Sequence, residues 1–172
     1  MICDKLQENN LLIRKIKKSD IESIRKWRNQ DHIRKYFINN TYINEVQQLE
    51  WFKKYSHKDD DIMFMVEETL EFQTVIGTVA LYNINKSENS AEFGRLMIGH
   101  LPAMGKGFGK RTAILASKYA FEILDISKIY LNVLSYNVKA IQLYKKIGFI
   151  IKSTSPHEIK MVLSKKDFLS QF

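Results

Sequence analysis

Cysteine and proline are scarce in this chain of 172 residues, which has one cysteine, Cys3, and two prolines. A single cysteine excludes an intramolecular disulfide, so nothing indicates an oxidising compartment. The two prolines and seven glycines form no linker-like stretch, and no segment repeats. We therefore predict a single domain over residues 1–172, a length in the usual range of about 100–200 residues for one domain.

Long hydrophobic runs are also missing. No apolar stretch approaches the roughly 20 residues that a membrane-spanning helix needs. The first residues, Met1 to Lys5, lack the basic and then apolar order of a secretion signal. We expect a cytoplasmic protein with no membrane partner.

Positive charge is in excess but dispersed. A net charge of +8 suits an anionic partner, such as a nucleic acid or a phosphorylated small molecule. The basic residues are spread from Lys5 to Lys166 without a dense tract, which argues against a dedicated nucleic-acid surface. His32, His57 and His157 have no companions at metal-ligand spacing, so we expect no metal.

The periodicity of apolar residues predicts a mixed α/β fold. Strands are expected at residues 11–16, 62–66, 74–81, 91–99, 128–134 and 159–163, with one more at 149–152. Helices are expected after Ser19 or Asp20, over residues 44–55, after the glycine-containing loop that follows the strand at 91–99, and between Asn137 and Gly148. This order predicts an α+β sandwich, in which helices flank a mostly antiparallel sheet of six to seven strands.

The most distinctive local pattern is a loop between the strand at 91–99 and a helix. It reads Met104-Gly105-Lys106-Gly107-Phe108-Gly109-Lys110. Glycines permit positive φ angles and close backbone approach, so N–H groups at a helix N-terminus can bind a pyrophosphate. The loop matches neither a Walker A motif nor the complete Gly-x-Gly-x-x-Gly fingerprint. It predicts a phosphate cradle, and the alternative is an ordinary glycine-rich turn.

A second motif follows the strand at 128–134 and reads Asn137-x-x-Ala140-x-x-Leu143-Tyr144-x-x-x-Gly148-Phe149. The two motifs in this order resemble the acetyl-coenzyme A site of the GNAT N-acetyltransferases. The resemblance runs from about Ala91 to Phe149. It implies acetyl-coenzyme A as co-substrate and a sheet that splays between the fourth and fifth predicted strands.

The resemblance also implies individual roles. Backbone groups near Met97 and Ile98 would hold the pantetheine arm and the oxyanion, Tyr144 would act as general acid toward the coenzyme A thiolate, and Asn137 would contact the arm or the phosphates. Asn137 and Tyr144 are seven residues apart and so share a helix face; the alternative for Tyr144 is a packed aromatic. The predicted cofactor set is Met97, Ile98, Met104, Gly105, Lys106, Gly107, Phe108, Gly109, Lys110, Asn137, Ala140 and Tyr144. Where this sequence has Met104, the family usually has Gln or Arg, so one polar contact near the phosphates is lost.

Acetyl transfer to an amine also needs a base. Glu92, at the start of a strand where several family members place a glutamate, is the first candidate, and His100 is the second. The alternative for Glu92 is a solvated carboxylate at a strand end.

The acceptor is predicted from a short stretch near the N-terminus. Trp27-Arg28-Asn29, followed by Arg34 and Tyr36, is similar to N-acetyltransferases of nucleotide-linked amino sugars, including those of pseudaminic acid assembly. Arginines suit a diphosphate and aromatic rings suit a base or sugar. We expect a small-molecule amine, such as a UDP-linked amino sugar. The alternative is an amphipathic helix with a core tryptophan and solvated arginines.

Other functions stay open. The overall pattern is also similar to ribosomal-protein-type N-terminal acetyltransferases, whose peptides would need an acidic groove; the acidic residues 59–68 are expected in solvated turns instead. Polyamine acceptors receive little support from a chain of charge +8. A non-catalytic acetyl-coenzyme A sensor and a basic nucleic-acid module are the alternatives outside enzymes. A monomer and a homodimer are both compatible with the sequence.

Overall fold

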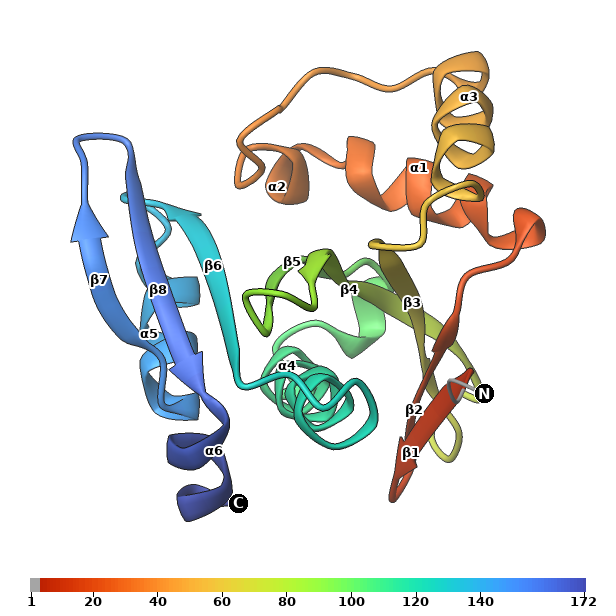
Figure 1. Cartoon of the computed structure of the whole chain (residues 1–172). Coiled ribbons are helices and arrows are strands. Elements are labelled where there is room, and N and C mark those ends of the chain that lie inside the picture. Colours follow the sequence, from red (N-terminus) through yellow and green to blue (C-terminus); the bar gives the residue numbers. More distant parts are fainter. Residues whose placement is uncertain (1–3) are drawn as a thin grey trace.

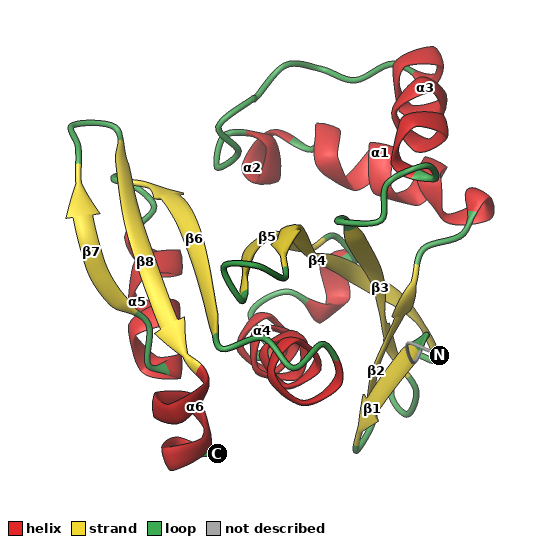
Figure 2. Ribbon diagram, in the orientation of Figure 1, coloured by secondary structure: helices red, strands yellow, loops and turns green. Residues whose placement is uncertain are grey.

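The computed structural model describes residues 4–172, which form one sheet with helices on both faces (Figures 1 and 2). The strands are β1 (Lys5–Glu8), β2 (Leu11–Lys15), β3 (Ile62–Glu68), β4 (Thr74–Asn85), β5 (Ser90–Ile98), β6 (Lys128–Leu134), β7 (Ile150–Thr154) and β8 (Glu158–Ser164). The helices are α1 (Ile21–Asn29), α2 (Asp31–Arg34), α3 (Glu45–Tyr55), α4 (Phe108–Lys118), α5 (Val138–Ile147) and α6 (Lys165–Gln171). A π turn, Tyr119–Ile123, extends α4.

The sheet has eight strands in the order β1-β2-β3-β4-β5-β6-β8-β7. Every neighbouring pair is antiparallel except β5 and β6, which pair in parallel only over Ser90–Glu92 and Lys128–Tyr130. Beyond these residues the two strands separate (Figure 1). The predicted mixed, mostly antiparallel fold is therefore confirmed, and the strands part where the resemblance implied.

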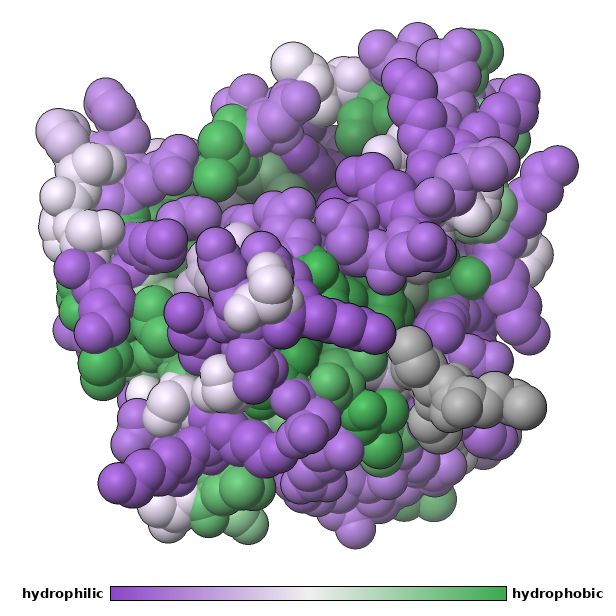
Figure 3. Space-filling view, viewed as in Figure 1, coloured by the Kyte–Doolittle hydropathy of each residue, from purple (hydrophilic) through white to green (hydrophobic). Residues whose placement is uncertain are grey.

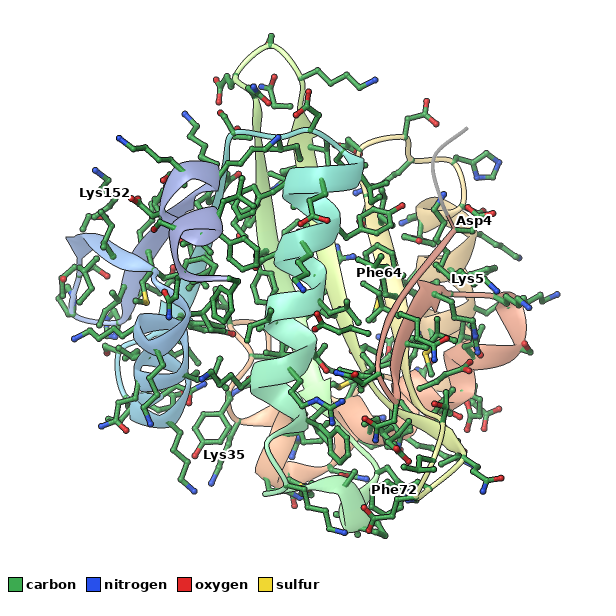
Figure 4. The ribbon with its side chains drawn as sticks, turned by 90° about the horizontal axis from the view of Figure 1, so that it is seen from below. Asp4, Lys5, Lys35, Phe64, Phe72 and Lys152 are labelled. Atoms are coloured by element: carbon green, nitrogen blue, oxygen red, sulfur yellow. The ribbon has the colours of Figure 1, made fainter. Side chains whose placement is uncertain are left out.

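Helices α1 and α3 lie on one face of the sheet and α4 on the other (Figure 2). Strand β3 is buried on both faces, so it reads as a continuous apolar run rather than an alternating one. Phe64 faces the larger core under α4, where its ring meets Tyr119 edge-on at 4.8 Å (Figure 4). Met63 and Met65 face the smaller core under α1 and α3.

A bulge interrupts the pairing of β4 with β5, because the register shifts between Thr78 and Ala80. Arg95 lies at this bulge with a φ of 51°, in the left-handed region that non-glycine residues rarely adopt. The bulge changes the direction of β5 just where β6 departs from it. It therefore helps to open the sheet.

Several predictions need correction. The sequence analysis missed β1 and α6, since Lys5–Glu8 is short and largely exposed and carries no clear apolar alternation. The acidic residues 59–68 are not all solvated, because Asp61 and Glu68 are buried. Asp61 pairs with Arg95, and Glu68 accepts hydrogen bonds from backbone N–H groups of the following turn.

None of the helices within residues 4–172 has the length and hydropathy to cross a membrane. On the face shown in Figure 3, hydrophilic side chains predominate and hydrophobic ones show between them.

Candidate active site

The parting of β5 and β6 opens a cavity of about 780 Å³. On the side facing β6, β5 has no strand partner after Glu92, so its backbone groups there are free to bind a ligand. The cavity is lined by most of the predicted cofactor residues: Met97, Ile98, Met104, Gly105, Gly107, Gly109, Lys110, Asn137, Ala140 and Tyr144. Residues more than 40 positions apart in the chain thus meet along one channel.

One end of the channel is the N-terminus of α4. Gly105 and Gly107 have φ angles of 76° and 82°, and a Cβ added at either would meet no atom within 4 Å. Open space therefore lies beside backbone that turns into a helix of eleven residues, where N–H groups and the helix dipole favour an anion. Lys110 adds a positive charge to the lining. This geometry fits the pyrophosphate of coenzyme A.

Two members of the predicted cofactor set point elsewhere. Lys106 forms an ion pair with Glu71 and lies over the ring of Phe72, and Phe108 is buried in the core. Neither lines the cavity among the described residues. Their place in the loop is as predicted, but their side chains serve packing rather than the channel.

The other wall of the channel is α5. Asn137 caps the helix, since its side chain accepts a hydrogen bond from the backbone N–H of Ala140 at 3.3 Å, and Gly148 ends it with a φ of 107°. Both ends are as predicted. Two turns along, Tyr144 is nearly buried between the rings of Phe93 and Phe149. Burial raises the pKa of the Tyr144 phenol, so its hydroxyl stays protonated and can donate a proton.

A second cavity, of about 540 Å³, adjoins the first on the side of α1 and α3. The two share Arg28, Phe37, Asn39, Arg95 and Met97 in their linings. An acceptor in the second cavity can thus reach the first near β5.

Arg28 lies at the junction of the two cavities. Its guanidinium stacks on the Phe37 ring at 3.8 Å and donates a hydrogen bond to the carbonyl of Asn39. Its Nη1 atom is buried and has no hydrogen-bond partner within residues 4–172. Burial, with the nearby charge of Arg34, lowers the pKa of Arg28 to about 10. One donor nitrogen of Arg28 therefore lacks a partner at the junction of the two cavities.

Only part of the predicted acceptor set lines these cavities: Arg28 and Tyr36 do, whereas Trp27, Asn29 and Arg34 do not. Trp27 packs on Gly99 so closely that a Cβ there would lie 2.0 Å from the indole ring. Asn29 bonds both backbone groups of Ile43, and Arg34 pairs with Asp31. These three side chains therefore have structural partners instead.

Sequence reasoning missed Arg95 and Tyr82, which line the first cavity. The Arg95 guanidinium makes two hydrogen bonds to the buried carboxylate of Asp61, at 2.7 and 2.9 Å, and lies over the ring of Tyr82 at 4.4 Å. No short motif marks these residues, because they are 13 to 34 positions apart. Their contacts depend on strand register and on the bulge.

The predicted bases, Glu92 and His100, do not line either cavity. Glu92 accepts hydrogen bonds from the Tyr82 hydroxyl at 3.1 Å, from Asn83 at 2.8 Å and from Asn132 at 3.1 Å. The Glu92 carboxylate is half-buried and is hydrogen-bonded through both of its oxygens. His100 packs its ring edge-on against Phe72 at 5.3 Å.

This arrangement, a splayed sheet with a helix N-terminus at one end of the opening and a buried tyrosine along it, suits transfer of an acyl group from a phosphate-bearing thioester. Residues 10–150 match the family model described as an acetyltransferase (GNAT) domain. The chain belongs to the GNAT acetyltransferase family. It is an N-acetyltransferase with acetyl-coenzyme A as co-substrate.

Individual relatives are similar over most of the chain. Spermidine N(1)-acetyltransferase of Vibrio cholerae is 32% identical over 142 residues, covering 83% of this chain and 80% of the relative. Acetyltransferase PseH of Campylobacter jejuni is 30% identical over 132 residues, covering 77% and 78%. The crystal structure of the V. cholerae spermidine N-acetyltransferase with CoA and spermine has a TM-score of 0.84 and 28% identity, covering 94% of this chain and 99% of that one.

Proposed function

We propose that this enzyme transfers the acetyl group to the primary amine of a nucleotide-linked amino sugar. The observation that carries the proposal is the position of Arg28, which lines both cavities and whose guanidinium has no carboxylate partner among the described residues. Arginine binds phosphate through several parallel N–H donors. An acceptor with a diphosphate would match this charge, and its sugar amine would extend toward β5.

The unpaired Nη1 of Arg28 supports an anionic acceptor. A buried polar atom without a partner is costly, and the cost is larger for a charged group. Since burial already lowers the pKa of Arg28 to about 10, a phosphate oxygen at this position would stabilise the charged form. The free enzyme thus holds a donor whose partner would arrive with the acceptor.

A polyamine is the second candidate, because relatives named spermidine N(1)-acetyltransferase are 32% and 29% identical to this chain. The electrostatics of the cavities argue against it. Among the described residues, neither lining contains an aspartate or glutamate, whereas Arg28, Lys35, Lys110 and Lys139 are present besides Arg95, whose charge Asp61 matches. A polycation would meet like charges without a carboxylate to bind it.

Within this proposal Tyr144 acts as the general acid. Acetyl-coenzyme A supplies the activated acyl group. Tyr144 holds its proton through neutral pH and donates it to the sulfur that leaves, while the free backbone edge of β5 near Ile98 binds the carbonyl oxygen. Phe93 and Phe149 keep the phenol in a mainly apolar surrounding, which favours its neutral form.

The direct test is thiol release from acetyl-coenzyme A with a panel of UDP-linked amino sugars, spermidine and basic N-terminal peptides. Selective turnover of an amino sugar is expected. Preference for spermidine, or for a peptide, would overturn the acceptor class and leave the N-acetyltransferase activity in place.

Arg28→Ala is expected to raise the KM for a nucleotide-sugar acceptor about 10- to 100-fold, because a charged hydrogen bond of about 1.5–3 kcal/mol is lost. The KM for acetyl-coenzyme A should change less than about threefold. Arg34→Ala is the matched control, since Arg34 pairs with the exposed Asp31 and lines neither cavity. Equal acceptor KM values for the two variants would show that Arg28 does not bind the acceptor.

A further inference from the structure

Glu92 is held firmly at the edge of the active site but does not line the cavity. Its Oε1 accepts hydrogen bonds from the Tyr82 hydroxyl and the Asn132 amide, and its Oε2 accepts one from Asn83. Tyr82 and Asn132, by contrast, both line the cavity. A group that reacts in the cavity therefore meets Tyr82 before it meets the carboxylate.

Strand geometry places Tyr82 on the correct side for an acceptor. Glu92 and Gly94 share one face of β5, while Phe93 between them faces the opposite side and packs on Tyr144. The Tyr82 side chain crosses β5 at Gly94, where a Cβ would lie 2.7 Å from its hydroxyl oxygen. The phenols of Tyr144 and Tyr82 thus reach the first cavity from opposite faces of the sheet.

Tyr82 also packs against the core under α1 and α3, the side on which the second cavity lies. The first cavity is lined by Tyr82, Gly94, Arg95 and Tyr144, among other residues. An amine that enters past Arg28 and Arg95 would come to the Tyr82 hydroxyl, and the thioester sulfur would lie toward Tyr144.

We propose that Tyr82 is a catalytic residue that relays a proton from the acceptor ammonium to Glu92. This relay rests on the proposed direct transfer of the acetyl group to an amine, whichever amine that is. The proton on the acceptor nitrogen passes to the Tyr82 oxygen as the Tyr82 proton passes to Glu92 Oε1. Tyr82 ends neutral, Glu92 becomes a neutral acid, and the amine gains a free electron pair.

The later steps balance. The amine nitrogen forms a bond to the carbonyl carbon, the carbon–sulfur bond breaks, and the sulfur takes the proton of Tyr144. The Tyr144 oxygen regains a proton from the amide nitrogen, and Glu92 releases its proton to solvent. The sum is one ammonium and one thioester giving one amide, one thiol and one proton.

The surroundings of Tyr82 suit a relay better than direct ionisation. Burial, and then the neighbouring Glu92, raise the pKa of Tyr82 well above its ordinary value, so a lasting phenolate is disfavoured. Arg95 lies over the ring, but its charge is matched by the paired Asp61. A concerted transfer leaves Tyr82 neutral before and after.

Other titratable groups face Glu92 from the neighbouring strands. Tyr130 of β6 is its register partner, and burial, with the charge of Glu92, raises the pKa of Tyr130. Lys160 of β8 lies over the Tyr130 ring at 4.8 Å. Tyr130 does not line the cavity among the described residues, which leaves Tyr82 as the phenol that contacts both the cavity and Glu92.

The test is the pH profile of kcat/KM, measured with an amine that the wild-type enzyme acetylates in the panel above. Tyr82→Phe and Glu92→Gln are each expected to lower kcat/KM about 100-fold at pH 7. The double variant should fall no more than about threefold further, because the two groups act in one chain. The deficits should shrink at a pH above the pKa of the acceptor amine, since the amine then arrives neutral.

A positioning role would give a deficit that is the same at every pH, and that result would overturn the relay. A Tyr82→Phe rate within threefold of wild type at pH 7 would overturn it too. Tyr136→Phe is the control, since it removes an exposed phenol that lines neither cavity and should leave the shape of the profile unchanged. Glu92→Gln keeps an acceptor oxygen for Tyr82, so it separates loss of the base from loss of folding. Failure of the amino-sugar acceptor in the panel is a separate result, because the profile uses any amine that turns over.

Discussion

Burial shifts the acid–base behaviour of Tyr144 and Arg28 in opposite directions. For Tyr144 the charged form is the deprotonated one, so burial raises the pKa. For Arg28 the charged form is the protonated one, so burial lowers the pKa to about 10. Tyr144 therefore keeps its proton through neutral pH and can donate it. The charged form of Arg28 is destabilised by burial unless an anion pairs with it.

Tyr144→Phe is expected to lower kcat about 100-fold, because general acid catalysis contributes typically about 10²–10⁴. The dissociation constant for coenzyme A should change less than about threefold, since the ring still fills its place between Phe93 and Phe149. Steady-state thiol release and calorimetric titration measure the two effects. An unchanged kcat would exclude the hydroxyl as the acid.

At the scale of an element, the N-terminus of α4 depends on glycine for two reasons. Gly107 is the N-cap of the helix and has a φ of 82°, which a side chain would strain, and the space beside its Cα is open. Backbone N–H groups can therefore approach a phosphate without a side chain between them. Met104, where the family usually has Gln or Arg, offers no polar side chain in this loop.

Gly107→Val is expected to weaken coenzyme A binding at least about 100-fold, because a branched side chain enters the phosphate space and is strained at positive φ. Gly109→Ala is the matched control. Gly109 has an ordinary helical φ, and its Cβ would meet only Leu143, at 3.7 Å, so affinity should stay within about threefold. Calorimetric titration with coenzyme A measures both, and equal affinities would refute the phosphate site.

At the scale of the whole molecule, the splayed sheet consists of two halves that are joined by the short pairing of β5 with β6. Strands β1–β5 with α1, α3 and α4 form one side, and β6–β8 with α5 form the other. Across the opening, the Tyr136 hydroxyl donates a hydrogen bond to the carbonyl of Lys35 at 2.7 Å. The phenols of Tyr82 and Tyr144, which line the cavity between the two halves, also make the stability of the fold sensitive to alkaline pH.

Stability is expected to fall as the pH rises above about 10, the ordinary pKa of tyrosine. The pKa values of Tyr82 and Tyr144 are raised in the folded protein, chiefly by burial. Above pH 10 the unfolded chain therefore releases protons that the folded chain keeps, and the stability present below that pH is lost. Urea unfolding at pH 8 and pH 11 measures the decrease.

Tyr144→Phe should reduce this decrease, by up to about 1.4 kcal/mol per pH unit. Tyr42→Phe, which removes an exposed phenol, should not reduce it. An equal decrease in the two variants would contradict a shifted Tyr144 pKa.

Local chemistry determined much of this protein from the sequence alone. The glycines at 105 and 107, the cap at Asn137, the C-terminal Gly148 and the seven-residue spacing to Tyr144 depend on neighbours a few positions away, so their pattern predicts a loop, a helix and a shared face. The sheet class followed from the order of the predicted strands and helices, and the parting of two strands from the resemblance to the GNAT family.

Tertiary structure alone decided which side chains meet in the cavities. The register of β4 and β5 brings Tyr82 to Glu92, and the bulge turns Arg95 toward Asp61 across 34 positions of sequence. Packing against Gly99 makes Trp27 a structural residue, although its sequence neighbours suggested a ligand contact. Such long-range contacts leave no periodic signal, because they depend on strand register, backbone bulges and the space that glycines leave open.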